Sequence, residues 1–244
     1  MSRNRQETLT IWSRRLAVLA LLILVGGTAL FRLGVMSYEL PLLGVAISVL
    51  LAVLSLFLTL FVLILQGDKL FKRKARRTLV LCLVVLVIPV SSIIAGAGKP
   101  VIHDITTDLD NPPVFKTVIN QRPDNANSLA IKPETIAIQK QAYPDMAPLR
   151  TDLPKPIIFA KTLKLVEEKG WQLVSDNIDL GEIEAIVTTP AFGFQDDVII
   201  RIQADDAGYR VDMRSVSRVG LGDLGANAKR IEGFLAELKI ALTQ

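Results

Sequence analysis

The sequence contains one cysteine and one histidine among 244 residues. Cys82 lies inside a long uncharged stretch, so residues 99–244 contain no thiol. A region without thiols forms no disulfide, offers no cysteine nucleophile and builds no thiolate metal site. We therefore expect this region to be held together by its own core, for which its length is ample.

Charged residues are absent from three long stretches, Leu16–Phe31, Leu40–Gln66 and Thr78–Gly98. A bilayer core about 30 Å thick is crossed by roughly 20 apolar helical residues. The first stretch reaches this length if Trp12 and the stems of Arg14 and Arg15 extend into the interface. The sequence thus predicts a membrane anchor over residues 1–98, with three transmembrane helices at about 12–32, 41–65 and 78–97.

Basic residues lie almost entirely on one side of these spans. The segment between the first two spans holds only Arg32, whereas ten basic residues lie before the first span and in the loop over 67–77. The ten are Arg3, Arg5, Arg14, Arg15, Lys69, Lys72, Arg73, Lys74, Arg76 and Arg77. Since cytoplasmic segments are enriched in Lys and Arg, this pattern predicts a cytoplasmic N-terminus and a C-terminal domain on the opposite side.

We therefore expect a multi-pass protein of the bacterial inner (cytoplasmic) membrane with a periplasmic domain. The alternative is that Leu16–Phe31 is a cleaved signal sequence. It is disfavoured because no good small-residue cleavage site follows and two further spans come after it.

The basic net charge belongs to the anchor. Residues 1–98 carry a net charge of +8 and residues 99–244 a net charge of −4, which together give the +4 of the whole chain. A mildly acidic soluble region argues against nucleic acid as a partner. The basic 69–77 segment has two interpretations, either charge that sets the topology or a contact with anionic lipid.

The soluble part is expected to have two sections. Residues 99–155 are rich in proline, which excludes a long helix or a central strand, so they predict an extended arm packed on the domain surface. Residues 156–244 predict an α+β domain with an antiparallel sheet of about four strands and two packed helices. The expected order is a helix from Pro156 to about Lys169, strands at Trp171–Asp176, Glu182–Thr189, Val198–Ala204 and Tyr209–Val216, and a helix from about Leu224 to Leu242.

The densest polar constellation runs from Arg214 to Arg230. Alternation along a strand places Arg214 and Arg218 on one side and Ser215 on the other. One hypothesis is an anion site made by these arginines and the start of the last helix. The alternative is structural: Asp223 caps that helix, and the arginines pair with Asp196, Asp197 or Asp212 across the sheet.

Two further groups contain carboxylates. His103, Asp104 and Asp108 can supply metal ligands or an acid/base pair, although a third or fourth metal ligand is not evident and turn formation explains them equally. Asp196-Asp197 and Asp205-Asp206 can bind Ca²⁺, but solvated turn residues are the simpler explanation. We expect no metal and no cofactor.

The soluble region resembles the family catalogued as domain of unknown function 1499, over about residues 99–242. The resemblance rests on Ile102–Asp108, Asn111–Phe115, Gly170-Trp171, Ile183–Ala185, Asp196–Ile202, Val211–Gly220 and Asp223–Ile231. It implies no reaction. It does imply that His103, Asp104, Asp108, Arg214, Ser215, Arg218, Asp223, Asn227 and Arg230 belong to the family's motif, and these nine are the candidate ligand-binding residues.

Three functional hypotheses remain open. The preferred one is a non-catalytic module that binds an envelope protein or a small ligand beside the lipid bilayer. The second is an envelope hydrolase or transferase acting on a lipid or another anionic substrate, with His103 or Asp104 as base and Arg214 and Arg218 holding the anion. The third is a structural scaffold for membrane partners.

Overall fold

The computed structural model describes residues 3–65, 69–206 and 208–243. Its contacts divide the chain into two units, one running to Ala95 together with Ala191–Gly193, the other formed by Gly96–Pro190 and the residues from Phe194. Gln66, the last residue of the second uncharged stretch, and Gly67 and Asp68 of the predicted loop lie outside the described residues.

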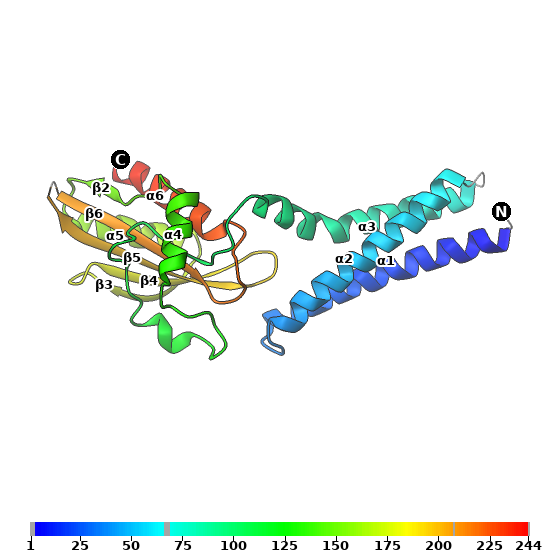
Figure 1. Ribbon diagram of the computed structural model, residues 1–244, viewed down its shortest axis with the longest axis horizontal. Coiled ribbons are helices and arrows are strands. Elements are labelled where there is room, and N and C mark those ends of the chain that lie inside the picture. Colours follow the sequence, from blue (N-terminus) through cyan, green and yellow to red (C-terminus); the bar gives the residue numbers. More distant parts are fainter. Residues whose placement is uncertain (1–2, 66–68, 207, 244) are drawn as a thin grey trace. The chain divides into compact units, whose positions relative to one another are not determined.

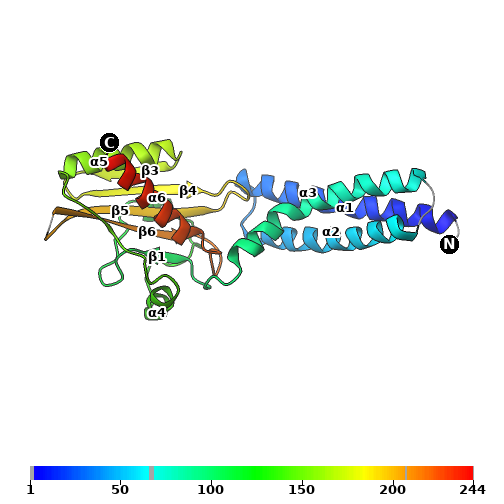
Figure 2. The same ribbon diagram turned by 90° about the horizontal axis from the view of Figure 1, so that it is seen from above.

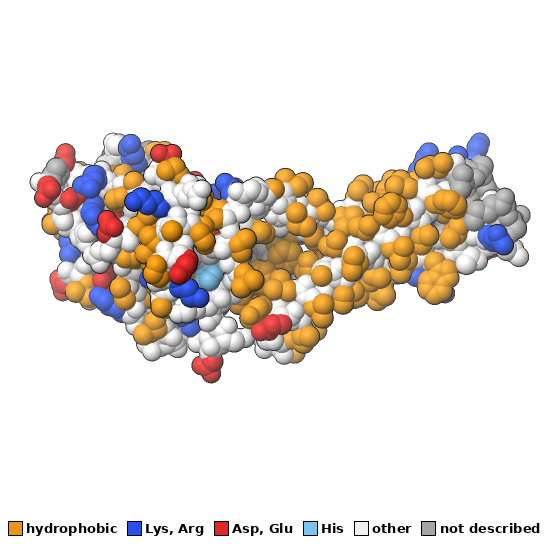
Figure 3. Space-filling view, viewed as in Figure 1, with side chains coloured by type: hydrophobic (Ala, Val, Ile, Leu, Met, Phe, Trp, Pro, Cys, Tyr) orange, Lys and Arg blue, Asp and Glu red, His pale blue; other side chains and the backbone are white. Residues whose placement is uncertain are grey.

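The first unit consists of three helices, α1 (Arg3–Arg32), α2 (Glu39–Leu65) and α3 (Lys69–Gly96), which are long and apolar enough to cross a membrane. Small side chains pack between them: Ala20 and Ala52 are fully buried with Val85. Ser55 Oγ donates to the Ser13 carbonyl at 2.6 Å. In Figure 3, hydrophobic side chains cover most of the visible face of these helices, as expected of helices that face lipid.

The basic segment before the third span is helical from Lys69 onward, so the expected loop over 67–77 is wrong for these residues. Lysine and arginine are good helix formers, and no glycine or proline separates Lys69 from the apolar stretch. The helix of the span therefore continues backward through the basic residues.

The second unit contains a six-stranded antiparallel sheet, in the order β1-β6-β5-β4-β3, with β2 also paired to β6. The strands are β1 (Asp104–Thr106), β2 (Leu149–Thr151), β3 (Gln172–Asn177), β4 (Glu182–Thr188), β5 (Gln195–Asp205) and β6 (Gly208–Ser217). The four expected strands are present. The expected number is too low, because β1 and β2 come from the proline-rich arm and add to the edge formed by β6.

One face of the sheet is covered by α5 (Lys155–Glu168) and α6 (Ala226–Leu242), the two expected helices. The main core lies between these two helices and the sheet and includes Ile158, Ile200, Met213 and Phe234. Figure 2 shows α6 crossing the strands of the sheet. The helices and strands together form the α+β sandwich that the sequence predicts.

The arm is more structured than expected. It contains the 3₁₀ helix η1 (Val118–Gln121) and a sixth α-helix, α4 (Pro133–Ala142), as Figure 1 shows. Pro133 stands at the first turn of α4, where the missing N–H costs nothing, so proline starts this helix instead of preventing it. The segment around η1 covers the second face of the sheet, where Phe115 and Val118 pack against Ile186, Ile199 and Val216.

The α4 helix closes the edge of the sheet beside β1. Gln139 is buried, and its side-chain amide bonds both backbone groups of Thr106: Oε1 accepts from the N–H at 3.1 Å and Nε2 donates to the carbonyl at 2.6 Å. The Gln139 side chain thus makes the two hydrogen bonds that a neighbouring strand would make. It covers a sheet edge that is otherwise open to pairing with another chain.

Candidate functional site

The nine candidate residues lie on both faces of the sheet and do not form one site. Because side chains alternate along β6, Arg214 and Arg218 face the arm, whereas Ser215 faces α6. Asp104 and Asp108 join the arm side, and Asn227 and Arg230 join the α6 side. The two groups must therefore be considered separately.

On the arm side, Asp104 and Arg214 form a buried two-bond ion pair. Arg214 donates to Asp104 through Nε at 3.0 Å and Nη2 at 2.7 Å. It also donates to the carbonyls of Pro113 and Leu129, and its guanidinium lies over the Phe115 ring. Every one of these partners belongs to the arm, so Arg214 fixes β1 and the following segment to β6.

Next to it, Asp197 is fully buried between two arginines. Arg218 donates to it through Nε at 2.9 Å and Nη2 at 2.7 Å, and Arg122 of the arm bonds its other oxygen. The expected pairing of Arg218 with Asp197 is thus present, but Arg214 pairs with Asp104 instead of a carboxylate across the sheet. The expectation that Asp196 and Asp197 are solvated turn residues is wrong, since both are buried in β5.

On the other face, Asn227 connects α6 to β6 and to the segment before β1. It is fully buried, and its Nδ2 donates to the His103 carbonyl at 3.1 Å and to Ser217 Oγ at 2.9 Å. Ser215 Oγ and Arg230 Nη1 both donate to Asn227 Oδ1. Arg230 also bonds Asp196 at 2.5 Å. Burial raises the pKa of Asp196 above its ordinary value, although the charge of Arg230 opposes the shift.

Asp223 caps the last helix. Its carboxylate accepts the N–H of Gly225 at 2.8 Å and that of Asn227 at 2.7 Å. The expected role of Asp223 as a hydrogen-bond acceptor at the start of the helix is thus present. The N-cap residue itself is Gly225, and α6 begins at Ala226, slightly later than expected. Leu224 and Gly225 both have positive φ, and this turn delays the start of the helix.

His103 lies beside this cluster but contributes mainly its backbone. Its carbonyl accepts from Ser217 N and Asn227 Nδ2, while the imidazole Nδ1 contacts only the Leu221 carbonyl, at 3.3 Å, in the part of the chain that the structure describes. Within that part, no group of three His, Cys, Asp or Glu side chains is placed to hold a metal ion. The imidazole thus has no carboxylate partner of the kind that orients a general base.

Asp108 lines a pocket. The pocket is about 330 Å³ in volume and is lined by Thr107, Asp108, Leu109, Asp110, Ile136, Lys140, Pro148, Arg150 and Arg210. It opens where the arm, α4, β2 and β6 meet, on the surface of the second unit. Three of its side chains are cationic and two are anionic, which suits a small polar ligand that carries negative charge.

The rear of this pocket is a network of two carboxylates and two arginines. Asp108 and the fully buried Asp212 both bond Arg201 and Arg210. Burial opposes the charge on Asp108, but the Asn111 N–H and the two arginines outweigh it and lower the pKa of this carboxyl. Arg201 Nε is buried and has no acceptor within the described residues, so the network can still donate one more hydrogen bond, to an acceptor atom.

Sequence reasoning missed several residues that hold this region together. Glu184 is buried between apolar neighbours in β4 and accepts the N–H groups of Lys116, Thr117 and Val118. Alternation along β4 places Glu184 opposite to Ile183 and Ala185, which is the pattern of a solvent-facing residue. Glu184 is buried, and caps η1, only because the arm covers that face of the sheet.

The comparisons with known proteins give one positive finding. No curated protein matches the chain. Residues 104–238, more than half of the chain, match the family described as protein of unknown function (DUF1499), a range that covers eight of the nine candidate residues and begins directly after His103. The protein therefore belongs to the DUF1499 family, as its sequence motifs predict.

Proposed function

We propose that the second unit is a non-catalytic binding domain for a small anionic ligand or an anionic group of a partner, and that the Asp108 pocket is its binding site. The observation that carries this proposal is the pocket lined by Lys140, Arg150 and Arg210. Lys140 is exposed and has no ion-pair partner among the described residues, so its charge is available to a ligand.

The pairing of the other candidates supports binding over catalysis. A hydrolase or transferase needs a base and an anion-holding arginine that reach the substrate. Asp104 and Arg214 neutralise each other below the surface, and Arg218 is engaged by Asp197. Groups that are paired in this way are suited to holding the arm on the sheet.

We further propose that the domain lies in the periplasm of a bacterium, anchored in the inner membrane by α1, α2 and α3. The support is the distribution of Lys and Arg on one side of the three apolar helices. The ligand would then be a component of the envelope, such as a phosphorylated or carboxylated fragment of a lipid or glycan.

Binding of glycerol 3-phosphate to the full chain in detergent, measured by calorimetry, tests this proposal, with glycerol as the uncharged comparison. We expect saturable binding of the phosphate compound alone. Removing the two cations in Lys140→Gln/Arg150→Gln should weaken it by about tenfold or more, because each lost charged contact costs roughly 1 kcal/mol or more.

Two control variants make the result specific to this pocket. Lys164→Gln removes an exposed cation from α5, and Lys239→Gln removes an exposed cation from α6. Both should bind glycerol 3-phosphate as the unchanged protein does. Equal binding by the Lys140→Gln/Arg150→Gln variant, or no binding of any small anion by the unchanged protein, would contradict the proposed site.

A further inference from the structure

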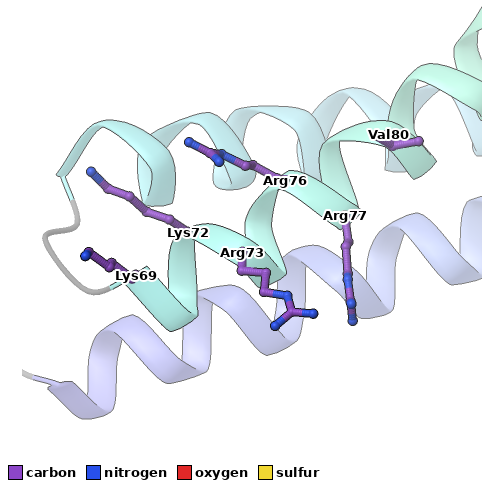
Figure 4. A pocket seen from close by; sticks show the side chains of 6 residues that line it. All are labelled: Lys69, Lys72, Arg73, Arg76, Arg77 and Val80. Atoms are coloured by element: carbon purple, nitrogen blue, oxygen red, sulfur yellow. The ribbon is translucent and has the colours of Figure 1, made fainter.

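Five cationic side chains lie along one side of α3. Lys69, Lys72, Arg73, Arg76 and Arg77 follow the three- and four-residue spacing that places side chains on one helix face. With Val80 they line a pocket of about 570 Å³, and Figure 4 shows Arg73 and Arg77 extending in the same direction from adjacent turns. None of the five cations forms an ion pair within the described residues.

This basic face points away from the rest of the helical unit. The buried residues of α3, among them Phe71, Ala75, Thr78 and Cys82, follow the opposite side of the helix. The remaining cation of the segment, Lys74, lies over the Phe71 ring and belongs to that other side. The five cations are therefore accessible, and their mutual repulsion is not relieved by any carboxylate of the described unit.

The same face becomes apolar one turn later. Val80, Leu83, Val84 and Val87 are exposed and continue the spacing of the cations toward the middle of the predicted span. Along the helix axis this surface is first cationic and then apolar. It therefore matches an anionic phospholipid, in which a negatively charged phosphate is followed by apolar acyl chains.

We propose that this face of α3 binds one anionic phospholipid, with the phosphate held by Arg73 and Arg77 and the acyl chains lying along Val80, Val84 and Val87. Guanidinium groups suit this role because their planar fork bonds two phosphate oxygens at once. The site is separate from the Asp108 pocket and does not depend on the function proposed for the second unit.

The test uses the full chain in nanodiscs of phosphatidylcholine that contain a minor fraction of phosphatidylglycerol. Native mass spectrometry counts the lipids that stay bound when the protein is released. We expect preferential retention of phosphatidylglycerol, and Arg73→Gln/Arg77→Gln should reduce it about tenfold, as expected for the loss of two cations near a lipid surface. A matched control, Arg5→Gln/Lys74→Gln, removes the same charge from positions outside the proposed site and should retain the lipid.

Three results would overturn the proposal. The first is equal retention of phosphatidylglycerol by the double variant and the control. The second is displacement of the bound lipid by an equal concentration of inorganic phosphate, which indicates a site for free anions. The third applies if the double variant does not fold. The single change Arg77→Gln, at an exposed position, is then measured, and a folded protein with unchanged lipid retention overturns the proposal.

Discussion

Buried arginine–carboxylate pairs hold together a domain that has no disulfide. Asp104 with Arg214, and Asp197 with Arg218 and Arg122, each join the arm to the sheet with both partners almost fully buried. Such pairs repay the cost of removing charge from water only when their remaining hydrogen-bonding groups are also satisfied. The carbonyls of Pro113, Gln121 and Leu129 fulfil this condition here.

Replacing Asp104 with Asn should therefore destabilise the second unit strongly. The change leaves Arg214 buried without its counter-charge, for which we expect a loss of about 3–5 kcal/mol in the free energy of unfolding. Trp171 stacks on Phe234 in the core, so its fluorescence in a Trp12→Phe background reports unfolding of this unit in urea. Lys164→Gln, which breaks an exposed pair with Glu168, should cost less than about 1 kcal/mol. Similar losses in the two variants would contradict this prediction.

Asp108 should make the stability of the domain sensitive to acid. Its folded pKa is lower than the ordinary value of 3.8, so ionised Asp108 stabilises the fold above pH 3.8, and this contribution is lost as the pH falls through the lower folded pKa. Asp108→Asn should be less stable at neutral pH and should lose less stability below pH 3.8 than the unchanged protein. Urea unfolding across this pH range, followed by Trp171, measures both slopes; parallel slopes would refute the assignment.

Many of the important residues and one of their ion pairs, Arg218 with Asp197, could be predicted from the sequence, but the partners that the arm supplies could not. The family motifs mark Asp104, Arg214 and Arg218, and alternation assigns the two arginines to one side of β6. Asp104 meets Arg214 only because β1 pairs with β6 over more than 100 positions of sequence. No local sequence pattern predicts a contact between residues so far apart in the chain. The arm's role in supplying partners for the ion pairs is therefore visible only in the folded structure.

At the scale of elements, the strands and helices with a long, regular pattern could be predicted and the short ones could not. β4, β5, β6, α5 and α6 each contribute buried residues to the core and show the matching period, and β3 follows from its alternating pattern and the turn before β4. β1 and β2 are three residues long, which is too short for a period, and the short helix α4 begins at Pro133 in a segment whose proline content predicts an extended arm. These three elements depend on tertiary contacts, such as the bonds between Gln139 and Thr106.

The start of α6 should depend on the carboxylate of Asp223. Replacing Asp223 with Ala leaves the N–H groups of Gly225 and Asn227 without their acceptor and should cost about 1 kcal/mol in the free energy of unfolding. Asp223→Asn keeps an acceptor oxygen and should be affected less. The same Trp171 unfolding assay compares the two, and an alanine variant as stable as the unchanged protein would show that the cap contributes nothing.

At the scale of the whole molecule, the account depends on the side of the membrane that each unit faces. Three helices are long and apolar enough to span. Ten of the eleven basic residues of the anchor region precede the apolar part of α1 or α3, whereas Arg32 follows the apolar part of α1. The proposed envelope ligand requires the second unit to be exported, and the proposed lipid site requires the basic face of α3 to meet a leaflet from the cytoplasmic side.

The most direct measurement is therefore the location of the C-terminal unit in a bacterial host. Alkaline phosphatase, which becomes active only after export, is fused behind Gln244 of the full chain, and a fluorescent protein that matures only in the cytoplasm is fused at the same point in a second strain. The account predicts active phosphatase and a dark fluorescent fusion. Inactive phosphatase together with a fluorescent fusion would place the domain in the cytoplasm and contradict the proposed function.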